Sequence, residues 1–145
     1  MKKPATDNSI DAQEASYLYV KPSQLVNAGK GLYTAIGIYK DEVISLFKGP
    51  ILSSKQIANR VLKNEDAYFI NMLDGTIMDS RQTPCYAKYA NDANGFSKSI
   101  FTNNAKIIID DNGDVCIVAT KNIKMNAEIF CSYGKAYWKK HGSTI

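Results

Sequence analysis

Glu128-Ile129-Phe130-Cys131-Ser132-Tyr133-Gly134 is a short, mostly apolar run that carries a tyrosine onto a glycine turn. Such a run, closed by a turn residue, predicts a β-strand over residues 128–132. Taken alone, the pattern indicates only a strand that enters a turn. It becomes informative beside two earlier stretches, the glycine turn Gly29-Lys30-Gly31 and the loop sequence Ala87-Lys88-Tyr89-Ala90-Asn91-Asp92-Ala93.

Length and composition describe one ordinary globular domain. A chain of 145 residues can bury one modest core, and its 45% apolar and 22% charged residues are usual for such a domain. No apolar run approaches the ~20 residues that a membrane-spanning helix needs. The basic start is followed by polar residues where a signal peptide needs apolar ones, so we expect residues 1–15 to form a flexible terminal segment.

The cysteine and histidine content argues against several kinds of site. The three cysteines show no Cys-x-x-Cys spacing, which favours a reduced intracellular compartment, either cytoplasm or nucleus. The single histidine, His141, has no ligand-spaced neighbours and no nucleophile partner, so neither a metal site nor a catalytic triad is expected. The net charge of +4 is mild and indicates neither nucleic acid nor a membrane as a partner.

Short strands separated by turn residues dominate the pattern, which predicts a mainly β protein rather than a βαβ array. Asp74-Gly75 and the cluster Asp110–Asp114 each predict the turn of a hairpin. The expected strands cover, in chain order, residues 17–21, 32–35, 43–47, 68–72, 76–79, 105–109, 115–119 and 128–132, with a short terminal helix over 136–140.

One helix is expected before the carboxyl end. Ser53 and Gln56 fit a capping box, which predicts a helix that runs to about Leu62. Ile57, Val61 and Leu62 would form its apolar stripe.

Two segments of the chain echo one another. Ile38, a polar turn and Glu42-Val43-Ile44 are similar to Ile123, a polar turn and Glu128-Ile129-Phe130. An internal repeat explains this, and so does the plain tendency of strands to follow polar turns; the sequence leaves both open.

In this order and at these distances, the segments resemble the SET-domain family of protein lysine methyltransferases over about residues 19–138. The family's glycine turn, its Gly-Glu-apolar-Ile strand and its strand pair closing on Ile-Asp are similar to residues 29–31, 40–44 and 68–79. Its Arg-Phe-Ile-Asn-His-Ser segment, the following Pro-Asn and its Glu-Leu-x-x-Asp-Tyr-Gly segment are similar to residues 88–93, 103–104 and 128–134. Six motifs in one order are more specific than any one of them.

The resemblance implies a compact fold of small, β-clip-like sheets with few short helices. In that fold the loop of Asn91 and the strand end at Tyr133 are threaded past one another as a pseudoknot. The SET domain would cover residues 16–138 and a short tail residues 139–145. No cysteine cluster follows Tyr133, so the chain resembles a minimal SET domain.

The same resemblance implies the chemistry. S-adenosylmethionine would be the methyl donor, with S-adenosylhomocysteine as product, and the ε-amine of a protein lysine would be the acceptor. Histone tails are the most familiar substrates of the family, so histone methylation and chromatin are expected contexts, although any lysine-bearing protein is allowed. In-line transfer to a neutral amine needs positioning more than a dedicated base, which suits a chain with one histidine.

The family's functional residues carry over position by position. Tyr133 would be the catalytic tyrosine beside the transferring methyl group; its alternative is packing at a strand end. Phe47 and Ile107 would line the substrate channel. The residues that would bind the cofactor are Gly29, Lys30, Gly31, Tyr68, Asn91, Asp92 and Trp138.

Each cofactor residue also has a plainer explanation. The glycine pair could form an ordinary hairpin turn, and Asn91 could cap its own loop. Tyr68 could be a core residue of a strand, and Trp138 could pack a terminal helix instead of stacking on adenine.

Three departures keep other functions open. Asp92 and Ala93 stand where the family has histidine and serine, and Phe47 replaces a tyrosine. They favour the alternative of a non-catalytic SET-like module that binds a peptide or the cofactor, and they leave the number of methyl groups added undecided. A small β-barrel that binds nucleic acid is a third reading, against which the mild charge argues. A homodimer that completes the substrate groove also stays open.

Overall fold

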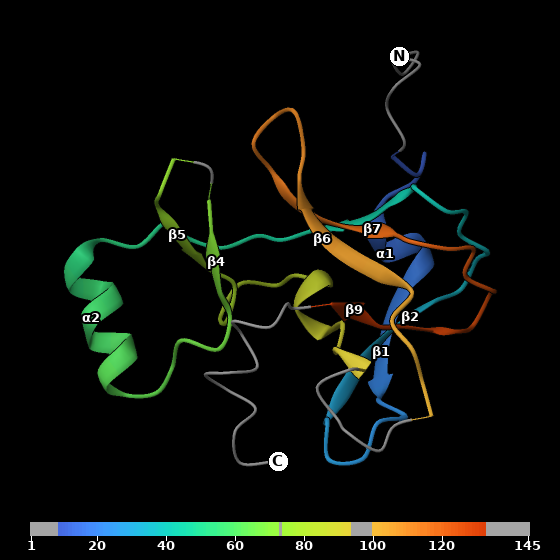
Figure 1. The fold of residues 1–145 in the computed structure, drawn as a ribbon, viewed down its shortest axis with the longest axis horizontal. Coiled ribbons are helices and arrows are strands. Elements are labelled where there is room, and N and C mark those ends of the chain that lie inside the picture. The colour runs from blue at the N-terminus through green and yellow to red at the C-terminus, as the bar shows by residue number, and fades with distance from the viewer. Residues whose placement is uncertain (1–8, 73, 94–99, 133–145) are drawn as a thin grey trace.

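The protein is described here by a computed structural model that covers residues 9–72, 74–93 and 100–132 (Figure 1). It consists of short strands in small sheets with few short helices, so the predicted mainly β fold is confirmed. The elements are α1 (Glu14–Tyr17), β1 (Leu18–Pro22), β2 (Lys30–Thr34), β3 (Val43–Leu46), α2 (Ser54–Leu62), β4 (Phe69–Asn71), β5 (Ile77–Asp79), the 3-10 helix η1 (Ala87–Tyr89), β6 (Ala105–Ile109), β7 (Val115–Ala119), β8 (Glu128–Ile129) and β9 (Cys131–Ser132). Within these ranges, no helix is long and apolar enough to cross a membrane.

The strands form three sheets. Their orders are β1-β2-β8, β3-β7-β6-β9 and β4-β5. Figure 1 shows β4, β5 and α2 on one side of the molecule and the two larger sheets on the other. The main core lies where the larger sheets meet, around the fully buried Leu32, Ile44, Ile117 and Ile129.

Local turn chemistry decides the hairpins. Strands β6 and β7 pair from Ala105↔Ala119 to Ile109↔Val115, with Gly113 at a positive φ of 82° in the turn. Strands β4 and β5 pair around Gly75, whose φ is 83°. Glycine takes such a conformation without the steric cost that other residues pay, and both predicted hairpins are confirmed.

Helix α2 begins as the capping box predicts, but its apolar residues are not buried. Gln56 N donates to Ser53 Oγ at 3.2 Å, and Ser53 N donates to Gln56 Oε1 at 2.8 Å. However, α2 has no buried residue, and Leu62 is 82% exposed. The helix is attached through the ion pair of Arg60 with Asp79 at 3.0 Å instead.

The predicted last strand is two strands, β8 and β9, which belong to different sheets. The side chain of Asn104 takes the place of a neighbouring strand at the break: its Oδ1 accepts from Phe130 N at 2.9 Å, and its Nδ2 donates to Glu128 O at 3.0 Å. The chain therefore changes sheets at Phe130 without leaving backbone groups unpaired.

The loop of Asn91 meets the last strand at this break. Asn91 and Phe130 form a parallel bridge, and Cys131 N donates to Asn91 O at 2.8 Å. Strand β9 then pairs in parallel with β6. The predicted meeting of these two segments is confirmed as far as Ser132; Tyr133 lies outside the described residues.

The two echoing segments form a pseudo-twofold pair. Ile38 and Ile123 exchange backbone hydrogen bonds of 2.8 and 2.7 Å, and both are buried. Asp41 and Asn126 follow at the same spacing with positive φ angles of 74° and 66°. Their amides donate to Ala119 O and Thr34 O respectively, so the two echoing segments make equivalent backbone contacts, as an internal repeat predicts.

The amino-terminal segment touches the sheet within its described part. Ser9 forms a parallel bridge with Val43, and the Glu14 carboxylate accepts from Ser45 Oγ and from Leu46 N. Ser9 and Glu14 thus contact β3, and the flexible terminal segment expected over residues 1–15 stays a prediction.

Candidate functional site

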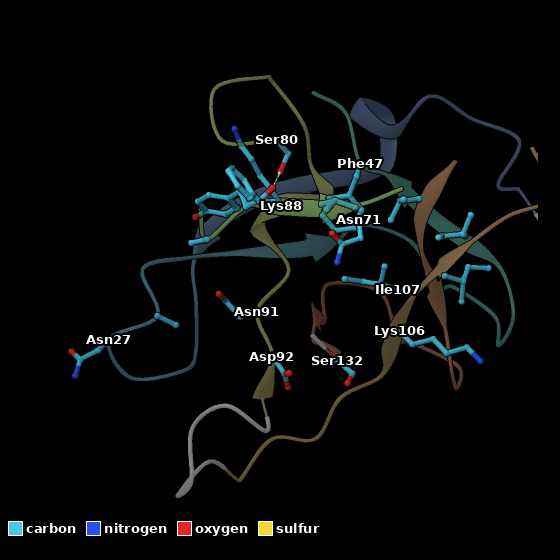
Figure 2. Close-up of a pocket in the computed structure, with 18 residues that line it drawn as sticks. Asn27, Phe47, Asn71, Ser80, Lys88, Asn91, Asp92, Lys106, Ile107 and Ser132 are labelled. Atoms are coloured by element: carbon cyan, nitrogen blue, oxygen red, sulfur yellow. Dashed lines mark hydrogen bonds between the residues drawn. The ribbon is translucent and has the colours of Figure 1, made fainter. Parts of the chain in front are cut away.

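A cavity of about 870 Å³ opens between β4, β6 and the loop of Asn91. Figure 2 shows Asn91, Asp92 and Ser132 on one side of it and Phe47 and Ile107 on another. Its lining residues come from both halves of the chain: Asn27, Ala28, Phe47, Ala67, Tyr68, Phe69, Ile70, Asn71, Ser80, Lys88, Asn91, Asp92, Lys106, Ile107, Ile108, Ile109, Val115 and Ser132. A polar side and an apolar side therefore face the same space.

Asn91 connects its loop to the glycine turn. Its Nδ2 donates to the backbone carbonyl of Lys30 at 2.9 Å. The side chain thus bonds across the site instead of capping its own loop, which was the alternative explanation of this residue. Its Oδ1 accepts no hydrogen bond from the described residues.

The two positions of the turn require glycine for different structural reasons. Gly29 has φ of 70° and open space around the position of a Cβ, so backbone conformation alone requires glycine there. Gly31 is buried, and a Cβ at that position would overlap the carboxylate of Glu128. The wall that this loop gives to the cavity consists of Asn27 and Ala28.

The aspartate in place of the family histidine has a partner inside the protein. Asp92 is buried, and its Oδ1 accepts from Asn103 Nδ2 at 2.8 Å. Asn103 Oδ1 in turn accepts from Ala93 N at 2.8 Å. Asp92 and Asn103 together hold the loop after Asn91. The Asp92 side chain therefore has a structural role that does not depend on what its backbone contacts.

The apolar side of the cavity contains both predicted channel residues. Phe47 follows the end of β3 and Ile107 lies in β6; both are partly buried and pack against the main core. Tyr68 precedes β4, is 41% exposed and lines the cavity, so it is not a core strand residue.

Lys88 is a lining residue to which sequence reasoning assigned no role. Its ammonium donates to the carbonyls of Thr83 and Arg81 at 2.9 and 3.1 Å and lies 5.4 Å from the centre of the Tyr89 ring. It holds the chain before η1 against the Asn91 loop. Its place in the family motif, where an arginine is usual, was the available signal.

Cys116 and Cys131 are poorly suited to act as nucleophiles. Burial raises the pKa of Cys116 to about 11, with Asp110 and Asp114 adding to the effect. Burial, and then the charge of Asp92, raises the pKa of Cys131 well above its usual range. Both thiols are neutral near pH 7, and the thiolate is the reactive form.

Tyr133 and Trp138 lie outside the described residues, so their predicted roles remain predictions. Ser132, the last described residue, is exposed and lines the cavity. Strand β9 therefore leads the chain to the site immediately before Tyr133.

The comparison with known families agrees with this geometry. The family model described as SET domain matches residues 29–134, which span the glycine turn, the Asn91 loop and the end of β9. The chain belongs to the SET domain family. No curated protein sequence matches it. SET domains are usually protein lysine methyltransferases and generally bind S-adenosylmethionine and a protein substrate, and the small sheets described above agree with the SET fold.

Proposed function

We propose that this SET domain transfers a methyl group from S-adenosylmethionine to the ε-amine of a protein lysine. The observation that carries the proposal is the hydrogen bond from Asn91 to Lys30 O. It joins the two family segments that would hold the cofactor at one edge of a cavity whose other side is apolar.

The residues present fit the cofactor. A volume of about 870 Å³ falls within the range of ~300–1,000 Å³ usual for small-molecule sites. The Oδ1 of Asn91, which accepts no hydrogen bond from a described residue, would accept from the cofactor's amino group. The backbone beside Asp92 would contact the adenine edge. The turn of Gly29, Lys30 and Gly31 would place the neighbouring Asn27 and Ala28 beside the methionine portion, and Tyr68 and Trp138 would provide aromatic faces.

When bound, S-adenosylmethionine would supply an electrophilic methyl group on a sulfonium. The protein's part is to hold the acceptor amine in line with it, which can contribute about 7–11 kcal/mol to lowering the barrier. Tyr133, directly after the cavity-lining Ser132, is proposed to orient that amine with its hydroxyl.

The apolar wall would deliver the amine in its neutral form. A lysine amine has a pKa near 10.4 in water, and burial disfavours its charged form. The side chains of Phe47 and Ile107 have no hydrogen-bonding group, and Asp92, the one carboxylate among the described lining residues, lies on the other side of the cavity (Figure 2). The channel therefore offers the ammonium little stabilisation.

Calorimetric titration of S-adenosylmethionine tests the proposal. Wild-type protein should bind saturably, and Asn91→Ala should weaken binding by about tenfold or more, since a hydrogen bond to a charged group contributes ~1.5–3 kcal/mol. Asn112→Ala, an equal truncation in the exposed turn of the β6–β7 hairpin, serves as the control and should leave affinity unchanged.

Turnover distinguishes the enzyme from the binding module. Transfer of labelled methyl to histones or to a whole-cell protein extract, lost in Tyr133→Phe, is expected of a methyltransferase. Saturable binding without transfer to any protein would indicate the non-catalytic SET-like module instead. A folded protein that binds no cofactor at millimolar concentration would overturn the proposal.

A further inference from the structure

Glu128 is a buried carboxylate outside the cavity lining. Its residue is 2% exposed, and it forms no ion pair with a described residue. It accepts hydrogen bonds from Ser23 Oγ at 2.6 Å, from Gln24 N at 2.9 Å and from Tyr33 OH at 3.2 Å, with Gln24 Nε2 at 3.4 Å. A buried charge is costly unless hydrogen-bond donors compensate it, and these donors stabilise the buried Glu128 carboxylate.

All of these donors come from the chain that frames the glycine turn. Ser23 closes the base of the loop, because its amide donates to Gly29 O at 2.8 Å and its Oγ accepts from Leu25 N at 3.1 Å. Gly31 packs directly on the Glu128 carboxylate. The carboxylate therefore holds both the start and the end of this loop.

The same loop reaches the site on its other side. It provides Asn27 and Ala28 to the cavity wall, and its Lys30 carbonyl accepts from Asn91. Glu128 itself is absent from the wall. Glu128 therefore makes no direct contact with a ligand in this cavity, and the loop that it holds is the contact between them.

We propose that Glu128 is a positioning residue that presets residues 23–31 for the cofactor and so determines cofactor affinity, not the rate of transfer from the bound cofactor. This inference rests on the proposed function. Pre-ordering a loop in its bound conformation removes an ordering cost that binding would otherwise include.

Two substitutions separate the hydrogen bonds from the bulk of the side chain. Glu128→Ala removes every acceptor. Glu128→Gln keeps Oε1 for Gln24 N and Tyr33 OH, and its amide can donate to Ser23 Oγ, whose hydroxyl can rotate. Glutamine should thus preserve most of the loop anchor.

The test combines titration of S-adenosylmethionine with amide hydrogen exchange. Glu128→Ala should raise the Kd by about tenfold or more, and Glu128→Gln by about threefold or less. At saturating cofactor, the single-turnover transfer rate of Glu128→Ala should stay within about threefold of wild type. Exchange over residues 23–31 should accelerate in Glu128→Ala without any cofactor, and exchange over residues 110–114 should not.

Glu14→Ala is the matched control. Glu14 is a partly buried carboxylate that also accepts from a serine hydroxyl and a backbone amide, but at β3. It should lower stability while leaving the Kd unchanged, which separates positioning from general destabilisation.

The outcomes separate this inference from the proposed function. Wild-type binding with an unchanged Kd in Glu128→Ala overturns the inference and leaves the function standing. Absence of wild-type binding overturns the function, and the exchange rates at residues 23–31 then decide whether Glu128 anchors the loop. If Glu128→Ala does not fold, Ser23→Ala replaces it, and an unchanged Kd and exchange rate in that variant overturn the inference.

Discussion

Tyr33 shows how a single buried side chain connects the glycine turn with β8. Its single hydroxyl proton is shared between two acceptors, Pro22 O at 2.7 Å and Glu128 Oε1 at 3.2 Å. Burial, followed by the charge and the hydrogen bond of Glu128, raises the pKa of Tyr33 from 10.0 to about 12. The phenol is thus kept in its neutral, donating form.

This pKa predicts a loss of stability in alkaline solution. A phenol with a higher pKa in the folded protein contributes stability that is complete below pH 10 and is lost as the pH rises towards 12. The free energy of unfolding should therefore fall more steeply over this window in wild type than in Tyr33→Phe. Urea unfolding at a series of pH values measures this free energy. An equal dependence on pH in the two proteins would contradict the raised pKa of Tyr33.

Among the elements, α2 depends on its cap more than on burial. Both hydrogen bonds of the Ser53–Gln56 box are present, no residue of α2 is buried, and the ion pair of Arg60 with Asp79 attaches it to β5. A helix with so little packing should unfold locally before the rest of the domain.

Ser53→Ala should destabilise α2 by about 1 kcal/mol, the usual contribution of an N-cap, and so raise amide exchange over residues 54–62 roughly fivefold. Ser54→Ala is the matched control, because Ser54 is exposed and its side chain donates to no described residue. Midpoints of global unfolding should change little in either variant. Equal exchange rates in both variants would show that the Ser53 cap does not determine the local stability of α2.

At the scale of the whole molecule, the two echoing segments meet at Ile38 and Ile123. Each side chain is almost fully buried, and each backbone amide donates to the other residue's carbonyl. Ile38 lies in the link between β2 and β3, and Ile123 in the link between β7 and β8. The glycine turn and Phe47 flank the first link, and Glu128 follows the second. Packing at this point therefore supports both sides of the site.

A double-mutant cycle tests this coupling. Ile38→Ala and Ile123→Ala should each lower the free energy of unfolding by about 2–5 kcal/mol, as truncation of buried isoleucines does. Since the two residues are neighbours, their effects should differ from additivity by ~0.5 kcal/mol or more. Ile36→Ala, at a more exposed position in the same turn, should cost less than either. Strict additivity would argue against one shared core contact.

Much of the fold could be predicted because its signals are local. The turns at Gly75 and Gly113 and the cap at Ser53 depend on residues only a few positions away, and these elements form where they were expected. Of the predicted site residues, Asn91, Asp92, Tyr68, Phe47 and Ile107 line one cavity, and their roles stay predictions. Lys88 was missed, because its bonds to Thr83 and Arg81 depend on how the irregular loop folds back.

The sequence by itself determined the mainly β class, the hairpins, the capped helix and the family, because periodicity, turn residues and ordered motifs act within short stretches. Only the tertiary structure decided that the last strand breaks at Phe130, since the side chain of Asn104 must arrive there to satisfy its backbone. It also decided that Gly31 is required by Glu128 and that Asn91 bonds to Lys30. Those contacts join residues far apart along the chain, and only the packing of the sheets brings them within hydrogen-bonding distance.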